Sequence, residues 1–82
     1  MTVVTLYGKP GCCLCDEARE VLERVRERHP FALRERDIEQ DDALLHRYLE
    51  RIPVVEIDGL EAFELFVDEP ELERLLCRVE AG

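Results

Sequence analysis

The first 38 residues constrain the fold most, because they predict a strand, a helix and a second strand in succession. Thr2–Tyr7 is β-branched and aromatic and ends at Gly8, which is typical of a buried strand. Over Cys13–Arg28 the apolar residues recur at helical spacing, and Pro30 ends that helix. Phe31–Ile38 alternates weakly and is highly charged, which suits an edge strand. This order predicts two parallel strands joined by a right-handed crossover.

The second half of the chain predicts four more elements and completes one domain over residues 1–82. In chain order they are a helix that begins at Gln40 or Asp41, a strand over Pro53–Ile57, a returning strand over Leu60–Val67 and a helix that starts at Asp68-Glu69-Pro70. The Asp58-Gly59 pair between the two strands is a strong signal for a hairpin turn. We therefore expect an α/β fold of order βαβαββα, with a four-stranded mixed sheet and helices on both faces.

Residues 9–18 read KPGCCLCDEA and contain three of the four cysteines in the chain. Cys12 and Cys15 form a Cys-x-x-Cys pair at the start of the first helix, where unpaired N–H groups and the helix dipole favour a thiolate. Because Cys12 lies nearer the helix end, we assign it as the nucleophile and Cys15 as the resolving thiol. Lys9 adds positive charge near Cys12, whereas the acids after Cys15 add negative charge there. We expect alkylation at neutral pH to label Cys12 first.

The remaining cysteines and the histidines predict no separate site. Cys13 is interpreted as a small residue between the two working thiols. The alternative is a third thiol that oxidises, binds a metal or competes with Cys15 in resolving the mixed disulfide. Cys77 should be exposed, because helical spacing places it opposite the apolar face of the last helix. That face is formed by Leu72, Leu76 and Val79. His29 and His46 lack the spacing to the cysteines that metal ligands need, and both are interpreted as surface or helix-end residues. A metal site shared between two chains stays an open alternative.

The charge balance argues against two classes of partner. The chain has 20 acidic and 11 basic residues and a formal net charge of −9. Phosphate backbones and anionic membranes are bound by clustered Lys and Arg, so we expect neither as a partner. The first residues lack the basic start and apolar run of a signal peptide, and no apolar run approaches the roughly 20 residues of a spanning helix. We expect a monomer in the cytoplasm. Because thiols are kept reduced there, closely spaced cysteines indicate a catalytic or metal-binding role rather than a permanent disulfide.

The chain resembles the thioredoxin-like superfamily and, within it, the glutaredoxins of bacterial type. The resemblance lies in the Cys-x-x-Cys between the first strand and helix, the approach Leu6-Tyr7-Gly8-Lys9-Pro10-Gly11-Cys12, and Ile52-Pro53 before a strand that leads to Asp58-Gly59. It implies a thioredoxin-like, glutaredoxin-type fold with Cys12 as the attacking thiol and Cys15 as the resolving one. It also implies a cis Ile52-Pro53 bond that faces the cysteines, with the Ile52 backbone available to hydrogen-bond a peptide or glutathione.

The resemblance also nominates charged groups for substrate binding. Lys9 matches the lysine that glutaredoxins direct at the glycine carboxylate of glutathione, and Arg51 is the other local cation that we nominate. The Gly-Gly and Asp that hold the other end of glutathione in glutaredoxins are not matched, because the chain reads LEAFELFVD from residue 60 to residue 68. The chain is therefore similar to a divergent member of that family.

The leading hypothesis is a thiol-disulfide oxidoreductase that uses the Cys12 and Cys15 couple to reduce protein or small-molecule disulfides. It needs no bound cofactor, and its reductant would be glutathione or a thioredoxin reductase. The alternatives are a noncatalytic iron-sulfur or metal-binding module, with Cys12 as a ligand across a dimer, and a thioredoxin-like adaptor whose thiols do not turn over. A resolving thiol at Cys15 favours the first hypothesis, because single-cysteine ligation does not need one.

Overall fold

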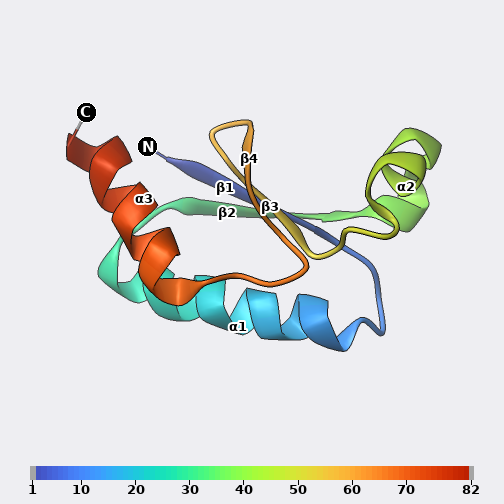
Figure 1. Cartoon of the computed structure of the whole chain (residues 1–82), viewed down its shortest axis with the longest axis horizontal. Coiled ribbons are helices and arrows are strands. Elements are labelled where there is room, and N and C mark those ends of the chain that lie inside the picture. The colour runs from blue at the N-terminus through green and yellow to red at the C-terminus, as the bar shows by residue number, and fades with distance from the viewer. Residues whose placement is uncertain (1, 82) are drawn as a thin grey trace.

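Three α-helices and four strands follow one another within residues 2–81 in the order that the sequence predicts (Figure 1). The computed structural model describes the backbone of residues 2–81 and the side chains of residues 2–78. The elements are β1 (Val3–Gly8), α1 (Cys13–Arg28), β2 (Ala32–Asp37), the 3-10 helix η1 (Ile38–Gln40), α2 (Asp42–Tyr48), β3 (Val54–Ile57), β4 (Leu60–Glu64) and α3 (Glu69–Ala81). No helix in this part of the chain is both long and apolar enough to cross a membrane.

The four strands form one mixed sheet in the order β2-β1-β3-β4. β1 is parallel to β2 and antiparallel to β3, and the hairpin places β4 antiparallel to β3. The first pair is parallel because α1 carries the chain from the end of β1 back to the start of β2. β2 lies at an edge, where its charged residues Arg34, Glu35 and Arg36 are exposed. The predicted order and the mixed sheet are confirmed.

α1 and α3 cover one face of the sheet and bury most of the core (Figure 1). The buried residues come from the central strands and from the apolar stripes of both helices. They are Val4, Leu6, Val55 and Ile57 in the sheet, Ala18, Leu22 and Val25 in α1, and Leu72 and Leu76 in α3. Burial of a large aliphatic side chain contributes about 1.5–3 kcal/mol. Cys77 is exposed on α3, as predicted, and Val79 lies outside the side chains described.

α2 lies at the other face of the sheet, near the end of β1 (Figure 1). Its residue Tyr48 is buried, and its ring packs on that of Tyr7 with a centroid distance of 4.7 Å. Tyr7 points away from the core under α1 because side chains alternate along a strand and Leu6 points into that core. A second apolar cluster forms here, and its buried members are Cys15, Ile38, Tyr48, Ile52 and Val54. This cluster joins α2 to the start of α1, where the Cys-x-x-Cys pair lies.

The returning strand is shorter than the sequence predicts. β4 ends at Glu64 instead of Val67, because Leu65 has a φ of 72°, in the left-handed region that interrupts a strand. The Leu65 N–H donates to the carbonyls of Arg51 at 3.1 Å and Pro53 at 2.9 Å. These bonds turn the chain toward the segment that precedes β3. Val67 is still buried, but it packs against the core from the loop before α3.

Candidate functional site

Cys12 is the N-cap of α1. Its backbone is extended, with φ −90° and ψ 110°, and the helix begins at the next residue. The Cys12 Sγ accepts a hydrogen bond from the Cys15 backbone N–H at 3.3 Å, and the Cys12 carbonyl accepts one from the Asp16 N–H at 3.1 Å. An N-cap side chain satisfies one of the free N–H groups at a helix start, and here sulfur takes that role. The half-buried Cys12 sulfur therefore lies against a backbone donor at the positive end of the helix dipole, where the sequence places it.

Cys15 is the inner thiol of the pair and is only 1% exposed. Burial, together with a hydrogen bond to Cys12, raises the pKa of the Cys15 thiol from its ordinary value of 9.0 to about 11. A hydrogen bond from the Lys9 backbone acts in the opposite direction, and the nearby charge of Asp16 adds a small further increase. Cys15 therefore stays protonated at neutral pH, as expected of a thiol that acts second.

Gly8, the last residue of β1, is a functional position that the sequence analysis missed. A Cβ at Gly8 would lie 2.8 Å from the Cys15 Sγ and 3.2 Å from the Cys15 Cβ. No side chain fits at a contact of that length, so the glycine lets α1 bring its inner thiol against the strand end. The available signal is a glycine at a strand end just before a Cys-x-x-Cys motif, which the sequence predicts as the end of the strand and as part of the glutaredoxin-like approach, but not as a contact of Cys15.

The Ile52-Pro53 segment lies beside the two thiols. The peptide bond between Ile52 and Pro53 is cis, as the resemblance implies. Ile52 belongs to the same apolar cluster as Cys15, and Cys12 packs against that cluster. The Ile52 N–H already donates to the Tyr48 carbonyl at 3.0 Å. Among the described residues no backbone N–H donates to the Ile52 carbonyl, so this carbonyl keeps its hydrogen-bonding capacity although Ile52 as a whole is only 8% exposed.

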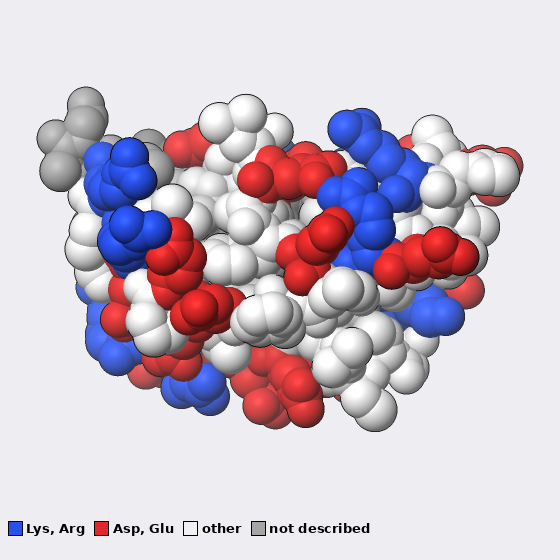
Figure 2. All heavy atoms as spheres, in the orientation of Figure 1, with Lys and Arg blue, Asp and Glu red and all other residues white. Residues whose placement is uncertain are grey.

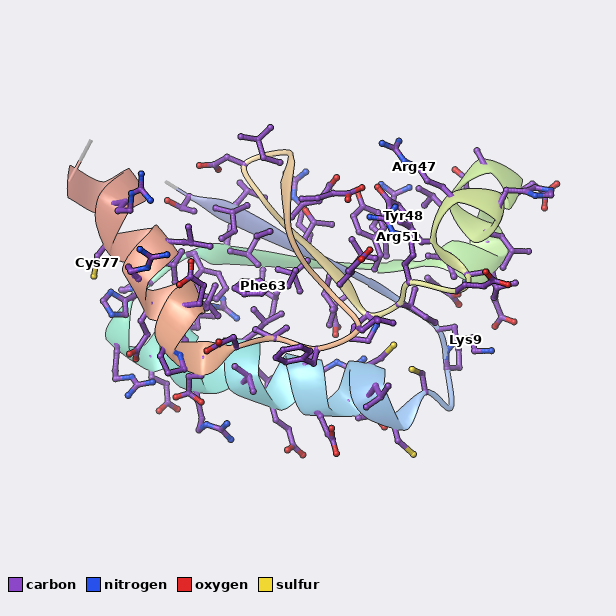
Figure 3. All side chains as sticks on the ribbon, viewed as in Figure 1. Lys9, Arg47, Tyr48, Arg51, Phe63 and Cys77 are labelled. Atoms are coloured by element: carbon purple, nitrogen blue, oxygen red, sulfur yellow. The ribbon has the colours of Figure 1, made fainter. Side chains whose placement is uncertain are left out.

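The two nominated cations lie in different environments (Figure 3). Lys9 is exposed on the loop after β1, and its ammonium makes no ion pair with any residue that the structure describes. Arg51 lies near the C-terminal end of α2, and its guanidinium carbon is 5.4 Å from the centroid of the Tyr48 ring. Hydrogen bonds from Arg51 to Glu64, at 2.6 Å, and to Glu61 raise the pKa of this guanidinium. Arg51 is therefore already paired, and the sequence analysis missed both of its carboxylate partners.

The other cysteines and the histidines lie outside this arrangement. Cys13 is the exposed first residue of α1, and Cys77 lies on α3 at the opposite end of the molecule from Lys9 (Figure 3). His29 is the C-cap of α1 and His46 is exposed on α2, in agreement with their interpretation as helix-end and surface residues. Within the described residues, no group of three or more His, Cys, Asp or Glu side chains is placed to hold a metal ion.

Comparison with known proteins places this site in a known fold. The chain matches the glutaredoxin-like domain family (DUF836) over residues 3–77. Structural genomics target protein XcR50 from X. campestris is 34% identical, with a TM-score of 0.77 over 92% of this chain and 96% of that chain. Protein Ne2328 from Nitrosomonas europaea is 25% identical, with a TM-score of 0.80 over 90% of this chain and 89% of that one. A mutant thioredoxin from Halobacterium salinarum NRC-1 is 25% identical, with a TM-score of 0.67 over 92% of this chain and 71% of that one. The predicted thioredoxin-like fold is thus confirmed, and the chain belongs to the glutaredoxin-like domain family.

Proposed function

We propose that the protein is a thiol-disulfide oxidoreductase that reduces disulfides of proteins or small molecules with Cys12 and Cys15. The observation that carries this proposal is the unequal environment of the two thiols. Cys12 is half-buried at the N-cap of α1, with its sulfur in a backbone hydrogen bond, whereas Cys15 is buried one turn further on. An accessible thiol at a helix start suits the first attack, and a shielded neighbour suits resolution.

The reaction proceeds in two exchange steps. The Cys12 thiolate attacks one sulfur of the substrate disulfide, a mixed disulfide forms, and the other substrate sulfur leaves as a thiolate that takes up a proton. Cys15 then loses its proton and attacks the Cys12 sulfur, which forms the Cys12–Cys15 disulfide and releases the second substrate thiol. The substrate gains two electrons and two protons, and the protein loses them.

The binding groups for the substrate flank the two thiols. The Ile52 carbonyl, with Pro53 fixed beside it, offers an acceptor for a backbone N–H of a bound peptide. Lys9, exposed on the loop three positions before Cys12, offers a cation that is paired with no described residue. Glutathione or a thioredoxin reductase would return the oxidised pair to the dithiol. No resident cofactor is needed, because the electrons come from the thiols themselves.

Trapping the mixed disulfide tests the proposal. Reduced Cys15→Ser protein should form a stable covalent adduct at Cys12 with a peptide disulfide, whereas Cys12→Ser should form none. Reduced wild-type protein should instead release two peptide thiols and lose two hydrogens in mass. Cys13→Ser and Cys77→Ser are the matched controls and should behave as wild type. Wild-type rates in Cys12→Ser would contradict the proposal, and iron or zinc bound through Cys12 in freshly purified protein would favour the metal-binding alternative.

A further inference from the structure

Arg51 and its two carboxylate partners form a charged cluster next to the Ile52-Pro53 segment. Arg51 directly precedes the cis Ile52-Pro53 bond, and its carbonyl is held by the Leu65 N–H at 3.1 Å. Its guanidinium contacts Glu61 and Glu64 and lies over the ring of Tyr48. In Figure 2 the blue atoms at the upper right, over α2 and the neighbouring segment, are bordered by red atoms on both sides. The positive charge of Arg51 is therefore already paired with carboxylates before any substrate arrives, although its side chain is 36% exposed.

A β-bulge places both carboxylates on the same face of the sheet. Glu61 pairs with Glu56 and Glu64 pairs with Val54, although the register shifts between Val55 and Glu56. Glu64 is three positions after Glu61, so in a regular strand their side chains would point to opposite faces. The extra residue in β4 restores them to one face, which is what a bulge does when it redirects a side chain near a site. Both carboxylates thus reach the single guanidinium of Arg51.

The sign of the cluster follows from its composition. With one guanidinium and two carboxylates, the Arg51, Glu61 and Glu64 cluster has a formal charge of −1. Its nearest charged neighbours keep that sign, because Arg47 at the Tyr48 ring adds one positive charge and Glu56, paired opposite Glu61, adds one negative charge. The bonds from the Leu65 N–H to the Arg51 and Pro53 carbonyls tie the end of β4 to the cis-proline segment, so the backbone positions of the cluster are held together. A substrate disulfide that reaches Cys12 past Ile52 therefore meets a net negative group on this side.

We propose that the Arg51, Glu61 and Glu64 cluster determines substrate specificity, by disfavouring disulfides with an acidic group beside the sulfur and favouring those with a basic or neutral one. This inference rests on the proposed function and narrows its substrate class to disulfides in basic or neutral protein segments. Like charges across an interface slow association and opposite charges speed it, and salt screens both effects. A glutathione moiety, with two carboxylates and one ammonium, belongs to the disfavoured class.

Stoichiometric reduction of a charge series tests the proposal without any added reductase. The probes are three symmetric peptide disulfides that differ only in a Lys, Gln or Glu next to the cysteine, with oxidised glutathione as a fourth. Second-order rate constants are measured by acid quenching and mass spectrometry with reduced protein at low and high salt. Wild type should react fastest with the Lys peptide and slowest with the Glu peptide, with a spread of roughly tenfold at low salt that shrinks as salt rises.

The variants identify the cluster as the cause. The double variant Glu61→Gln/Glu64→Gln should lose the spread or reverse it, and oxidised glutathione should gain several-fold in rate. Arg51→Gln leaves two unpaired carboxylates and should widen the spread. The matched control is Glu71→Gln/Glu73→Gln, which changes the net charge by the same amount on α3, away from the thiols (Figure 1), and should keep the wild-type order.

Two outcomes would overturn the inference. The first is equal rate constants for all peptides with wild type. The second is an unchanged spread of rate constants in Glu61→Gln/Glu64→Gln, with an intact circular dichroism spectrum. Either would show that the cluster does not determine which disulfides react. Failure of every probe to react with reduced wild type would instead contradict the proposed function itself, and with it this inference. The two failures are therefore distinguishable in the same assay.

Discussion

Substitution of Gly8 by alanine should destabilise the protein, and the loss should depend on the Cys15 sulfur. A Cβ at Gly8 would lie 2.8 Å from the Cys15 Sγ, well inside van der Waals contact, and the backbone φ of Gly8 is not in the left-handed region. The strain is therefore steric and directed at one side chain. The thiol must shift or the start of α1 must move away from the end of β1.

The magnitude follows from two opposing effects. Forcing an extra methyl group into a packed site costs about 1–3 kcal/mol. Replacing glycine by alanine in a strand otherwise gains about 0.5–1 kcal/mol, because the unfolded chain loses freedom. The free energy of unfolding of Gly8→Ala should therefore fall by about 1–2 kcal/mol, which lowers Tm by roughly 4–8 °C per kcal/mol in a domain of this size. Resolution of the mixed disulfide should slow as well, because the inner thiol is displaced from Cys12.

A double-mutant cycle tests this reasoning. Urea unfolding under reducing conditions is measured for wild type, Gly8→Ala, Cys15→Ala and the double variant. Without the sulfur, the nearest atom to the new methyl group is the β-carbon of residue 15 at 3.2 Å, still a tight contact, so Gly8→Ala should cost less in that background than in wild type. The expected coupling free energy is about 1–2 kcal/mol. The same loss in both backgrounds, or a stabilised Gly8→Ala single variant, would refute the steric explanation.

Two further predictions concern Cys15 and Leu65. Because burial raises the pKa of Cys15 from 9.0 to about 11, the unfolded chain releases this proton first, so the free energy of unfolding should fall as pH rises from about 9 to about 11. The pKa of Tyr7 is also raised, from 10.0 to about 12, so the contribution of Cys15 is measured between about pH 9 and about pH 10. In that range Cys15→Ala should remove most of the slope in urea unfolding curves while Cys77→Ala keeps it; an unchanged slope in Cys15→Ala would contradict the assignment. Leu65→Gly should leave the free energy of unfolding unchanged or raise it by up to about 1 kcal/mol, since glycine adopts a φ of 72° without steric cost, whereas Leu65→Ala should not raise it. A loss above about 1 kcal/mol in the same unfolding assay would show that the Leu65 side chain, and not its backbone, holds this turn.

Features that depend on neighbours in the chain were predictable from the sequence. The bounds of α1 follow from the apolar spacing after Cys13 and from Pro30, which cannot continue a helix. The place of Cys12 at the helix start and of Cys15 one turn further on was predictable in the same way, and the roles that we assign to the two thiols stay predictions. The end of β4 was mispredicted, since the apolar run to Val67 looks like a strand and only the backbone at Leu65 interrupts it.

The sequence alone predicted the element order, the mixed sheet and the place of the Cys12 and Cys15 pair at a helix start, because hydrophobic period, proline and glycine act over a few residues. The tertiary structure decided what surrounds those thiols. It placed Gly8 against Cys15, and it brought Glu61 and Glu64 to Arg51 through a bulge in β4. Contacts of this kind join segments far apart in the chain, and a one-residue shift in strand register would move a side chain to the other face of the sheet. The sequence therefore shows that residue 51 is an arginine, whereas only the fold shows that its guanidinium is already paired with two carboxylates.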